Sequence, residues 1–194
     1  MSQQLKNMYI CKEKLIIMDK IGVFCSSSNN MDEIYYSSAE ALGKLLGKKG
    51  KTLVYGGSRC GLMEAVARSA KGNGARVFGV VPRKLIQNNM VSDHIDVTFH
   101  ADELSDRKQW LIGESDIMIA MPGSVGTLDE AFSAMAENVF GIHNKKVVFW
   151  NINGFWDDLF KMIDGLKSKG VVNKPFDTCM MRADTLEELE KIID

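Results

Sequence analysis

The chain has 194 residues, a hydrophobic content of 45%, a charged content of 25% and a formal net charge of −1. This length suits one domain with a full hydrophobic core. The near-neutral charge excludes the basic field of a non-specific nucleic-acid binder and the polybasic patch of a membrane-surface protein, and no apolar run approaches the roughly 20 residues needed to span a bilayer.

The start of the chain predicts no folded element. It mixes polar residues with Leu15-Ile16-Ile17 and lacks the apolar stretch and small-residue cleavage site of a secretory signal. We interpret residues 1–17 as a flexible extension, or as the product of an upstream start codon, and place one domain at residues 18–194. The four cysteines are scattered without a CxxC pair, so we expect reduced thiols in a cytoplasmic protein.

Short apolar strands alternate with amphipathic helices along the rest of the chain. The predicted strands cover residues 20–25, 52–55, 77–81, 96–99, 116–120 and 146–150, the last being the final strand. The predicted helices cover residues 31–49, 62–71, 105–115, 131–140, 155–169 and 185–193. This alternation is typical of βαβ units and of a parallel sheet covered on both faces. It predicts the α/β class, with a single doubly wound Rossmann-like domain that binds ligands beyond the carboxyl ends of its strands.

Glycine and serine residues follow several of these strands. The turn at residues 56–61 contains Gly56, Gly57 and Gly61, but it lacks the G-x-G-x-x-G spacing of a dinucleotide fingerprint and the spacing of a P-loop. A tight strand-to-helix turn explains these glycines as well as a ligand does. This turn alone therefore does not decide between a structural and a functional role.

Residues 122–130, Pro-Gly-Ser-Val-Gly-Thr-Leu-Asp-Glu, form the most informative motif. A turn between a strand and a helix aims backbone N–H groups and the positive helix end at an anion. Gly123 and Gly126 leave room for that anion, and Thr127 could serve both as N-cap and as phosphate ligand. The structural alternative is a capping box formed by Thr127 and Glu130. A capping box does not explain the proline and the two glycines before it.

Arg107 and Lys108 lie together in the predicted helix at residues 105–115. Two adjacent cations usually mark a solvated helix face. If the start of this helix faces the crevice, Arg107 can instead make the planar, two-pronged contact that a phosphate prefers. The histidines and cysteines show no metal-ligand spacing, so the sequence does not indicate a zinc enzyme.

These motifs occur with three further segments: Val23-Phe-Cys-Ser-Ser-Ser28, Tyr55-Gly-Gly…Gly61-Leu-Met-Glu-Ala65 and Gly79-Val-Val-Pro82. In this combination and order, from about residue 20 to residue 170, the chain resembles the LONELY GUY (LOG) family. Its members are cytokinin-activating nucleoside 5′-monophosphate phosphoribohydrolases, long mislabelled as lysine decarboxylases. We find no pyridoxal-phosphate lysine motif that would support the decarboxylase label.

The resemblance implies hydrolysis of the N-glycosidic bond of a purine riboside 5′-monophosphate, either AMP or a cytokinin riboside monophosphate, to free base and ribose 5-phosphate. It implies that Arg107 and Glu130 are the catalytic pair, with the carboxylate beside the ribose, where positive charge builds as the base leaves. The residues implied to bind or neighbour the phosphate are Ser27, Gly57, Lys108, Gly123, Ser124, Gly126 and Thr127. The family needs no metal or organic cofactor and forms homodimers, so a homodimer or higher homo-oligomer is expected.

The chain departs from the family pattern in several places. Ser124 stands where the family usually has a second glycine. If that position needs a positive φ, the serine is strained there. If it does not, the serine hydroxyl can add a contact to the phosphate. Leu104-Ser105-Asp106 replaces the Met-His of plant-type members, and residues 87–91 lack a substrate-facing glutamate. Because of these departures, the sequence does not determine which purine base the substrate carries. They also motivate an alternative hypothesis, a non-catalytic nucleotide-binding or carrier protein of the same fold.

Overall fold

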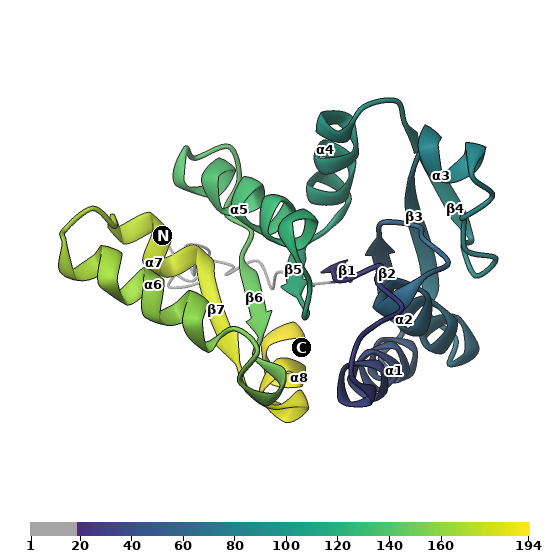
Figure 1. The fold of residues 1–194 in the computed structure, drawn as a ribbon, viewed down its shortest axis with the longest axis horizontal. Helices are drawn as coiled ribbons and strands as arrows, with labels where there is room; N and C mark the ends of the chain where they lie inside the picture. Colours follow the sequence, from purple (N-terminus) through teal and green to yellow (C-terminus); the bar gives the residue numbers. More distant parts are fainter. Residues whose placement is uncertain (1–18) are drawn as a thin grey trace, which may run out of the picture.

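The computed structural model describes residues 19–194, which form one parallel sheet with helices on both faces (Figure 1). The strand order is β4-β3-β2-β1-β5-β6-β7. The strands are β1 (Lys20–Phe24), β2 (Thr52–Tyr55), β3 (Arg76–Pro82), β4 (Val97–Ala101), β5 (Ile117–Ala120), β6 (Val147–Trp150) and β7 (Met180–Ala183). The sheet grows outward in opposite directions from β1 and β5, so the predicted doubly wound α/β fold is confirmed.

Two hydrophobic layers cover the sheet. The helices are α1 (Glu33–Lys48), α2 (Gly61–Gly72), α3 (Arg83–Gln87), α4 (Leu104–Glu114), α5 (Val125–Val139), α6 (Asp157–Ser168), α7 (Lys174–Cys179) and α8 (Leu186–Ile193), with a 3₁₀ turn at Ile152–Gly154. Helices α1, α2 and α8 pack on one face, and α4, α5, α6 and α7 pack on the other. Strand side chains alternate between the two layers. Ile21 and Val23 of β1 pack in the layer that contains α1, α2 and α8, whereas Phe24 packs in the layer that contains α4 to α7.

The prediction that residues 146–150 form the final strand is wrong, because β7 follows and pairs with β6. The register joins Val147 to Met180 and Trp150 to Ala183. Strand β7 is a short edge strand, and its sequence, Met-Met-Arg-Ala, contains no β-branched residue. Pairing with β6, rather than local propensity, therefore makes this segment a strand. The short helices α3 and α7 are likewise not predicted from the sequence.

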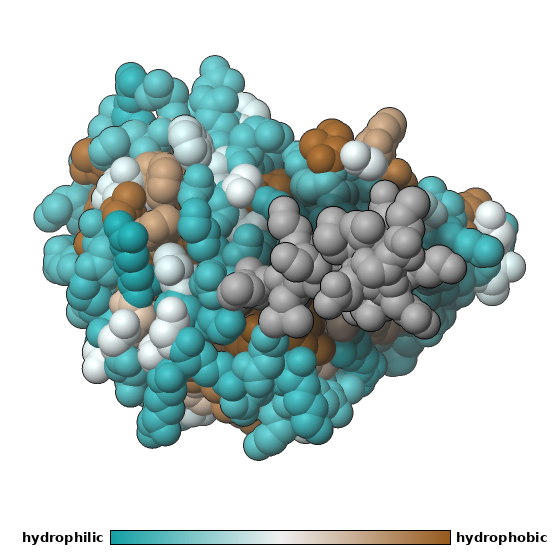
Figure 2. Space-filling model, turned by 180° about the vertical axis from the view of Figure 1, so that it is seen from behind, coloured by the Kyte–Doolittle hydropathy of each residue, from teal (hydrophilic) through white to brown (hydrophobic). Residues whose placement is uncertain are grey.

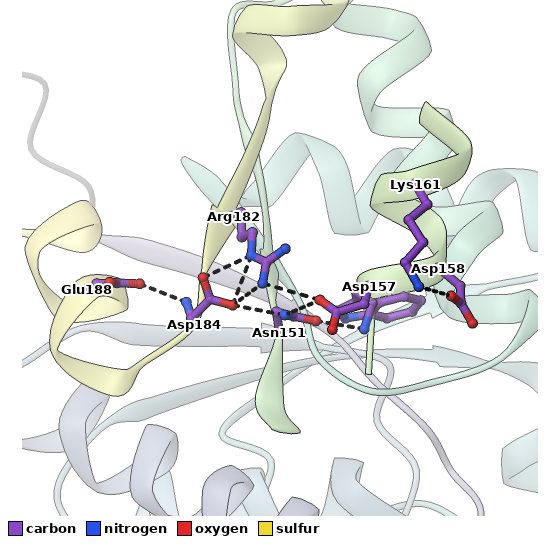
Figure 3. Close-up of polar contacts among 8 residues, drawn as sticks. Asn151, Asp157, Asp158, Lys161, Arg182, Asp184 and Glu188 are labelled. Carbon is purple, nitrogen blue, oxygen red and sulfur yellow. Dashed lines mark hydrogen bonds and ion pairs between the residues drawn. The ribbon is translucent and has the colours of Figure 1, made fainter. Parts of the chain in front are cut away.

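A polar network ties the ends of β6 and β7 to the start of α6 (Figure 3). Asn151 is buried, and its Nδ2 donates to Asp184 Oδ1 at 2.8 Å, while Arg182 Nη2 donates to the same oxygen at 2.6 Å. Asn151 Oδ1 accepts from the backbone N–H of Trp156 at 2.7 Å, and the indole Nε1 of Trp156 donates to the carbonyl of Ala120 at 3.2 Å. The network thus fixes the end of β5, from which the turn of the 122–130 motif begins.

The described part of the chain contains no helix that is both long and apolar enough to cross a membrane. Figure 2 shows one face of the molecule, on which hydrophilic residues predominate and apolar residues form small separate patches. The predicted extension at residues 1–17 lies outside the described residues.

Candidate functional site

A cavity of about 350 Å³ lies at the carboxyl ends of β1 and β5, where the direction of the strand order reverses. Ligands bind at this place in doubly wound sheets. The lining comes from the turn after β1 and from the starts of α2, α4 and α5: Cys25, Ser26, Ser27, Ser28, Met63, Arg107, Ser124, Gly126, Thr127 and Glu130. The structure therefore brings six of the predicted site residues to one cavity: Ser27, Arg107, Ser124, Gly126, Thr127 and Glu130. Hollows of about 370 and 430 Å³ lie elsewhere, but among the described residues neither has a buried ion pair in its lining.

The N-terminus of α5 presents free backbone donors to this cavity. Ser124 is the N-cap residue, and no side chain caps the helix. The backbone N–H of Leu128 bonds to the carbonyl of Ser124 at 3.0 Å. The backbone N–H groups of residues 125–127 have no acceptor within residues 19–194. Together with the positive end of the helix dipole, they form a site suited to an anion.

The structural alternative of a capping box formed by Thr127 and Glu130 is wrong, and so is the N-cap role of Thr127. The helix begins at Val125 rather than at residue 131, so Thr127 and Glu130 both lie inside it. The carboxylate of Glu130 binds Arg107 instead of the backbone. The side chain of Thr127 packs against Gly123, where an added Cβ would overlap Thr127 Oγ1 and lie 2.7 Å from its Cβ. Gly123 is therefore required for packing of the turn onto the helix.

Ser124 is unstrained. Its φ of −110° lies outside the left-handed region that favours glycine. The first of the two alternatives for this residue, strain, is thereby excluded. Its side chain is exposed and lines the cavity, where the hydroxyl is free to donate.

Replacing Ser124 with Ala is expected to weaken binding without affecting the fold. A hydrogen bond to a charged group contributes about 1.5–3 kcal/mol, so the KM or Kd for a nucleoside monophosphate should rise ~10-fold or more. Ser124→Gly should behave like Ser124→Ala, because no strain is relieved. Isothermal titration with AMP checks this, and a gain in affinity from Ser124→Gly would contradict the assignment.

The turn after β1 provides more hydroxyl groups. Ser26 Oγ accepts from the backbone N–H of Ser28 at 3.0 Å, and Ser28 Oγ accepts from that of Asn30 at 3.1 Å. These bonds use the oxygens as acceptors and leave both hydroxyl protons available to donate. We call Ser26, Ser27, Ser28, Ser124 and Thr127 the hydroxyl cluster.

Gly61, the first residue of α2, holds the 26–28 turn in place. Its φ is +59°, and an added Cβ would lie 2.5 Å from the carbonyl oxygen of Ser28 and 2.6 Å from the carbonyl carbon of Ser27. The backbone N–H of Leu62 donates to the carbonyl of Ser26 at 3.0 Å. Only glycine fits this contact between two backbones.

Gly61→Ala is accordingly expected to lower the free energy of unfolding by roughly 1–3 kcal/mol, the usual range for a strained backbone position. The collision with backbone atoms adds to this loss. Chemical denaturation of the variant and the wild type measures it. An unchanged denaturation midpoint would contradict this prediction, because it would mean that the 26–28 turn shifts away from the added methyl group without loss of stability.

Arg107 from α4 and Glu130 from α5 form a buried ion pair. Arg107 Nη1 donates to Glu130 Oε1, and the side chains are 13% and 6% exposed. Burial raises the pKa of the Glu130 carboxyl above its ordinary value, and the positive charge of Arg107 opposes this rise. Arg107 Nε is buried and has no hydrogen-bond partner among the described residues. The pair therefore places a carboxylate and a guanidinium together at one cavity wall.

Cys25 lies in the same cavity but does not have the character of a nucleophile. Burial, followed by the nearby charge of Glu130, strongly raises the pKa of its thiol. Since the thiolate is the reactive form, this cysteine is inert at neutral pH. Cys25 and Met63 were not among the site residues expected from the sequence, although both lie within motifs that carry the family resemblance.

Lys108 and Gly57 do not line the cavity. Lys108 Nζ donates to Asp129 Oδ1 at 2.9 Å and to Ser133 Oγ at 3.1 Å, which braces α4 against α5. Gly57 has a φ of +76°, and an added Cβ would lie 2.6 Å from Val81 Cγ2. Both residues support the site from outside, and their contact with a phosphate stays a prediction.

Comparisons with known proteins bear on the identity of this site. A family model described as "Possible lysine decarboxylase" matches residues 63–193. The chain is 34% identical over 170 residues to a probable cytokinin riboside 5′-monophosphate phosphoribohydrolase of Oryza sativa subsp. japonica, covering 88% of this chain and 69% of the relative. It is 30% identical over 175 residues to a cytokinin riboside 5′-monophosphate phosphoribohydrolase of Arabidopsis thaliana, covering 90% and 81%.

A solved structure shares the fold. The molybdenum cofactor binding protein from Rippkaea orientalis superposes with a TM-score of 0.70 at 24% identity, covering 92% of this chain and 96% of the other. At that identity the likeness concerns the fold alone. The family match and the two plant relatives agree with the resemblance that the motifs at 107–108 and 122–130 carry. The chain therefore belongs to the LOG family of cytokinin riboside 5′-monophosphate phosphoribohydrolases.

Proposed function

We propose that the protein hydrolyses the N-glycosidic bond of a purine riboside 5′-monophosphate, AMP or a cytokinin riboside monophosphate, to the free base and ribose 5-phosphate. The observation that carries this proposal is the buried Arg107–Glu130 pair in the same cavity as the uncapped N-terminus of α5. The names of the plant relatives support the reaction class.

The phosphate is assigned to the N-terminus of α5. Free N–H groups of residues 125–127, the helix dipole and the hydroxyl cluster supply donors without a lysine. Gly126 adds no side chain there, and an added Cβ at this position would meet no atom within 4 Å. The open space above Gly126 lets a phosphate approach the backbone closely.

The ribose then lies beside Glu130, one turn further along α5. In the reaction the C1′–N bond breaks and its electron pair leaves with the base, while positive charge develops on the sugar. The carboxylate stabilises that charge and orients water toward C1′. Overall, water supplies a hydroxyl group to C1′ and a proton to the departing base. Arg107, whose Nη1 already holds Glu130, uses its remaining N–H groups to orient polar atoms of the substrate.

The competing function is a nucleotide carrier without turnover. The shared fold with a molybdenum cofactor binding protein is the observation in its favour. Strain at Ser124 would have been an argument for a carrier, but the φ of that residue excludes such strain. A carrier also gains nothing from a buried carboxylate facing an anion site, because the carboxylate repels the anion. We therefore favour hydrolysis.

We also propose a homodimer. Phe140 and Ile142, at the end of α5, are 86% and 71% exposed, which is typical of residues at an interface. Light scattering of the purified protein tests this proposal, and a monomer at micromolar concentration would contradict it.

The activity is tested by incubating the protein with AMP, with isopentenyladenosine monophosphate and, as a control without phosphate, with adenosine. Chromatography of the products follows the free base. We expect base release from a monophosphate and far slower release from adenosine. Tight AMP binding with no base released from any monophosphate by the folded protein would favour the carrier.

A further inference from the structure

We propose that Gly56 is a positioning residue for Arg107, and that the lack of a side chain at this position holds the guanidinium against Glu130. The kinetic consequence of this inference rests on the proposed function, whereas the geometric part does not. The residue lies at the end of β2, in the turn where the resemblance to the LOG family singles out Gly57 instead.

The guanidinium of Arg107 lies directly against the backbone of Gly56. An added Cβ at Gly56 would overlap Arg107 Nη2 and would lie 3.2 Å from its Cζ and 3.2 Å from Met63 Sδ. Arg107 and Met63 both line the cavity. The space that a side chain would fill at this position is therefore already occupied by the wall of the site.

Two contacts determine how the guanidinium is oriented. Nη1 donates to Glu130 on one side, and Nη2 packs on Gly56 on the other. The side chain is 13% exposed, and Nε has no partner within the described residues. Because a guanidinium is planar, fixing both terminal nitrogens fixes the direction in which Nε points. The contact with Gly56 thus holds the guanidinium in the orientation that forms the bond to Glu130.

The three glycines of this turn are needed for different reasons. Gly57 and Gly61 have φ values of +76° and +59°, which an alanine rarely adopts. Gly56 does not have a positive φ, so its backbone accepts alanine. At Gly61 the colliding atoms belong to the backbone, but at Gly56 they are the ends of flexible side chains. Alanine at Gly56 should therefore leave the turn intact and displace Arg107.

The displaced guanidinium should affect catalysis more than binding. A shift of about 1 Å in a positioned group can cost 10²-fold in rate, so we expect kcat of Gly56→Ala to fall roughly 10²-fold with KM changed less than about threefold. The pH profile should move as well. Arg107 opposes the rise in the pKa of Glu130, so its displacement should shift the acidic limb of the activity profile to higher pH.

The test compares Gly56→Ala with Gly113→Ala, which adds the same methyl group to open space on α4, the helix that carries Arg107. Gly113→Ala should keep wild-type kinetics. Crystal structures of both variants should show Arg107 displaced from Glu130 only in Gly56→Ala. An unmoved Arg107 in Gly56→Ala, or an unchanged kcat and pH profile, would overturn the inference.

A double variant separates positioning from folding. Lysine has no Nη2, so Gly56→Ala should cost much less in the Arg107→Lys background than in the wild type. Additive effects of the two substitutions on kcat would overturn the inference. If Gly56→Ala alone fails to fold, the double variant Gly56→Ala/Arg107→Lys should fold, because its shorter side chain relieves the collision. Failure of both variants to fold would also overturn the inference. If the wild type releases no base, the proposed function fails, but the crystal structures still decide whether Gly56 positions Arg107.

Discussion

Replacing Glu130 with Gln is expected to reduce base release by about 10²–10⁴-fold, the range for removal of a positioned acid–base or charge-stabilising group. Glutamine has nearly the same shape and keeps an oxygen for Arg107, but it cannot offset the positive charge that forms on the ribose. Affinity for AMP should be retained or improved, because a negative charge near the phosphate is removed. Single-turnover kinetics with AMP separates the two effects.

Asp129→Asn is the matched control. Asp129 directly precedes Glu130 on α5, but its carboxylate is exposed and pairs with Lys108 outside the cavity. This variant loses a carboxylate of the same charge and should keep kcat within about twofold, since an exposed pair contributes only about 0–1 kcal/mol. If both variants lose activity equally, the general charge of α5 matters rather than the carboxylate at position 130.

Replacing Arg107 with Ala is expected to destabilise the protein as well as inactivate it. The substitution leaves a buried carboxylate without its ion-pair partner, and breaking such a pair costs about 3–5 kcal/mol. Burial already raises the pKa of Glu130, and without Arg107 this pKa rises further. Denaturant unfolding at a series of pH values measures the loss.

The direction of the pH dependence follows from proton binding. With a raised pKa, Glu130 binds its proton more tightly in the folded state than in the unfolded state, so its contribution to stability falls as the pH rises through the folded pKa. The deficit of Arg107→Ala relative to wild type should therefore be smallest in acid, where Glu130 is protonated, and should grow toward neutral pH. Arg59→Ala, which breaks the exposed pair with Asp93, should show no such trend. A deficit that does not change with pH would contradict the pairing.

The sheet could be predicted from the sequence because its central strands are buried on both faces. Thr52–Tyr55 is predicted with its observed bounds, and the other central strands differ by a residue at their ends. Strand β7 could not be predicted, because pairing with β6 rather than composition makes it a strand. The sequence predicts the start of α5 at residue 131, because Pro122, Gly123 and Gly126 are typical of a loop. In the structure Val125 and Gly126 are already helical.

The candidate site could be predicted as a set of motifs but not in its contacts. The resemblance to the LOG family selected Arg107 and Glu130, and the structure brings them into one ion pair. No sequence pattern indicated that Lys108 points toward α5 or that Gly56, rather than Gly57, packs on Arg107. Which of two adjacent residues faces a cavity depends on the relative placement of α4, α5 and β2, and tertiary packing determines that placement.

The central claim is that one cavity holds the phosphate at the N-terminus of α5 and the ribose at Glu130. A crystal structure of Glu130→Gln with AMP tests this most directly, because the variant binds substrate without consuming it. We predict phosphate oxygens within hydrogen-bond distance of the backbone N–H groups of residues 125–127, and C1′ facing residue 130. AMP bound with its phosphate elsewhere, or with its ribose turned away from residue 130, would contradict the account.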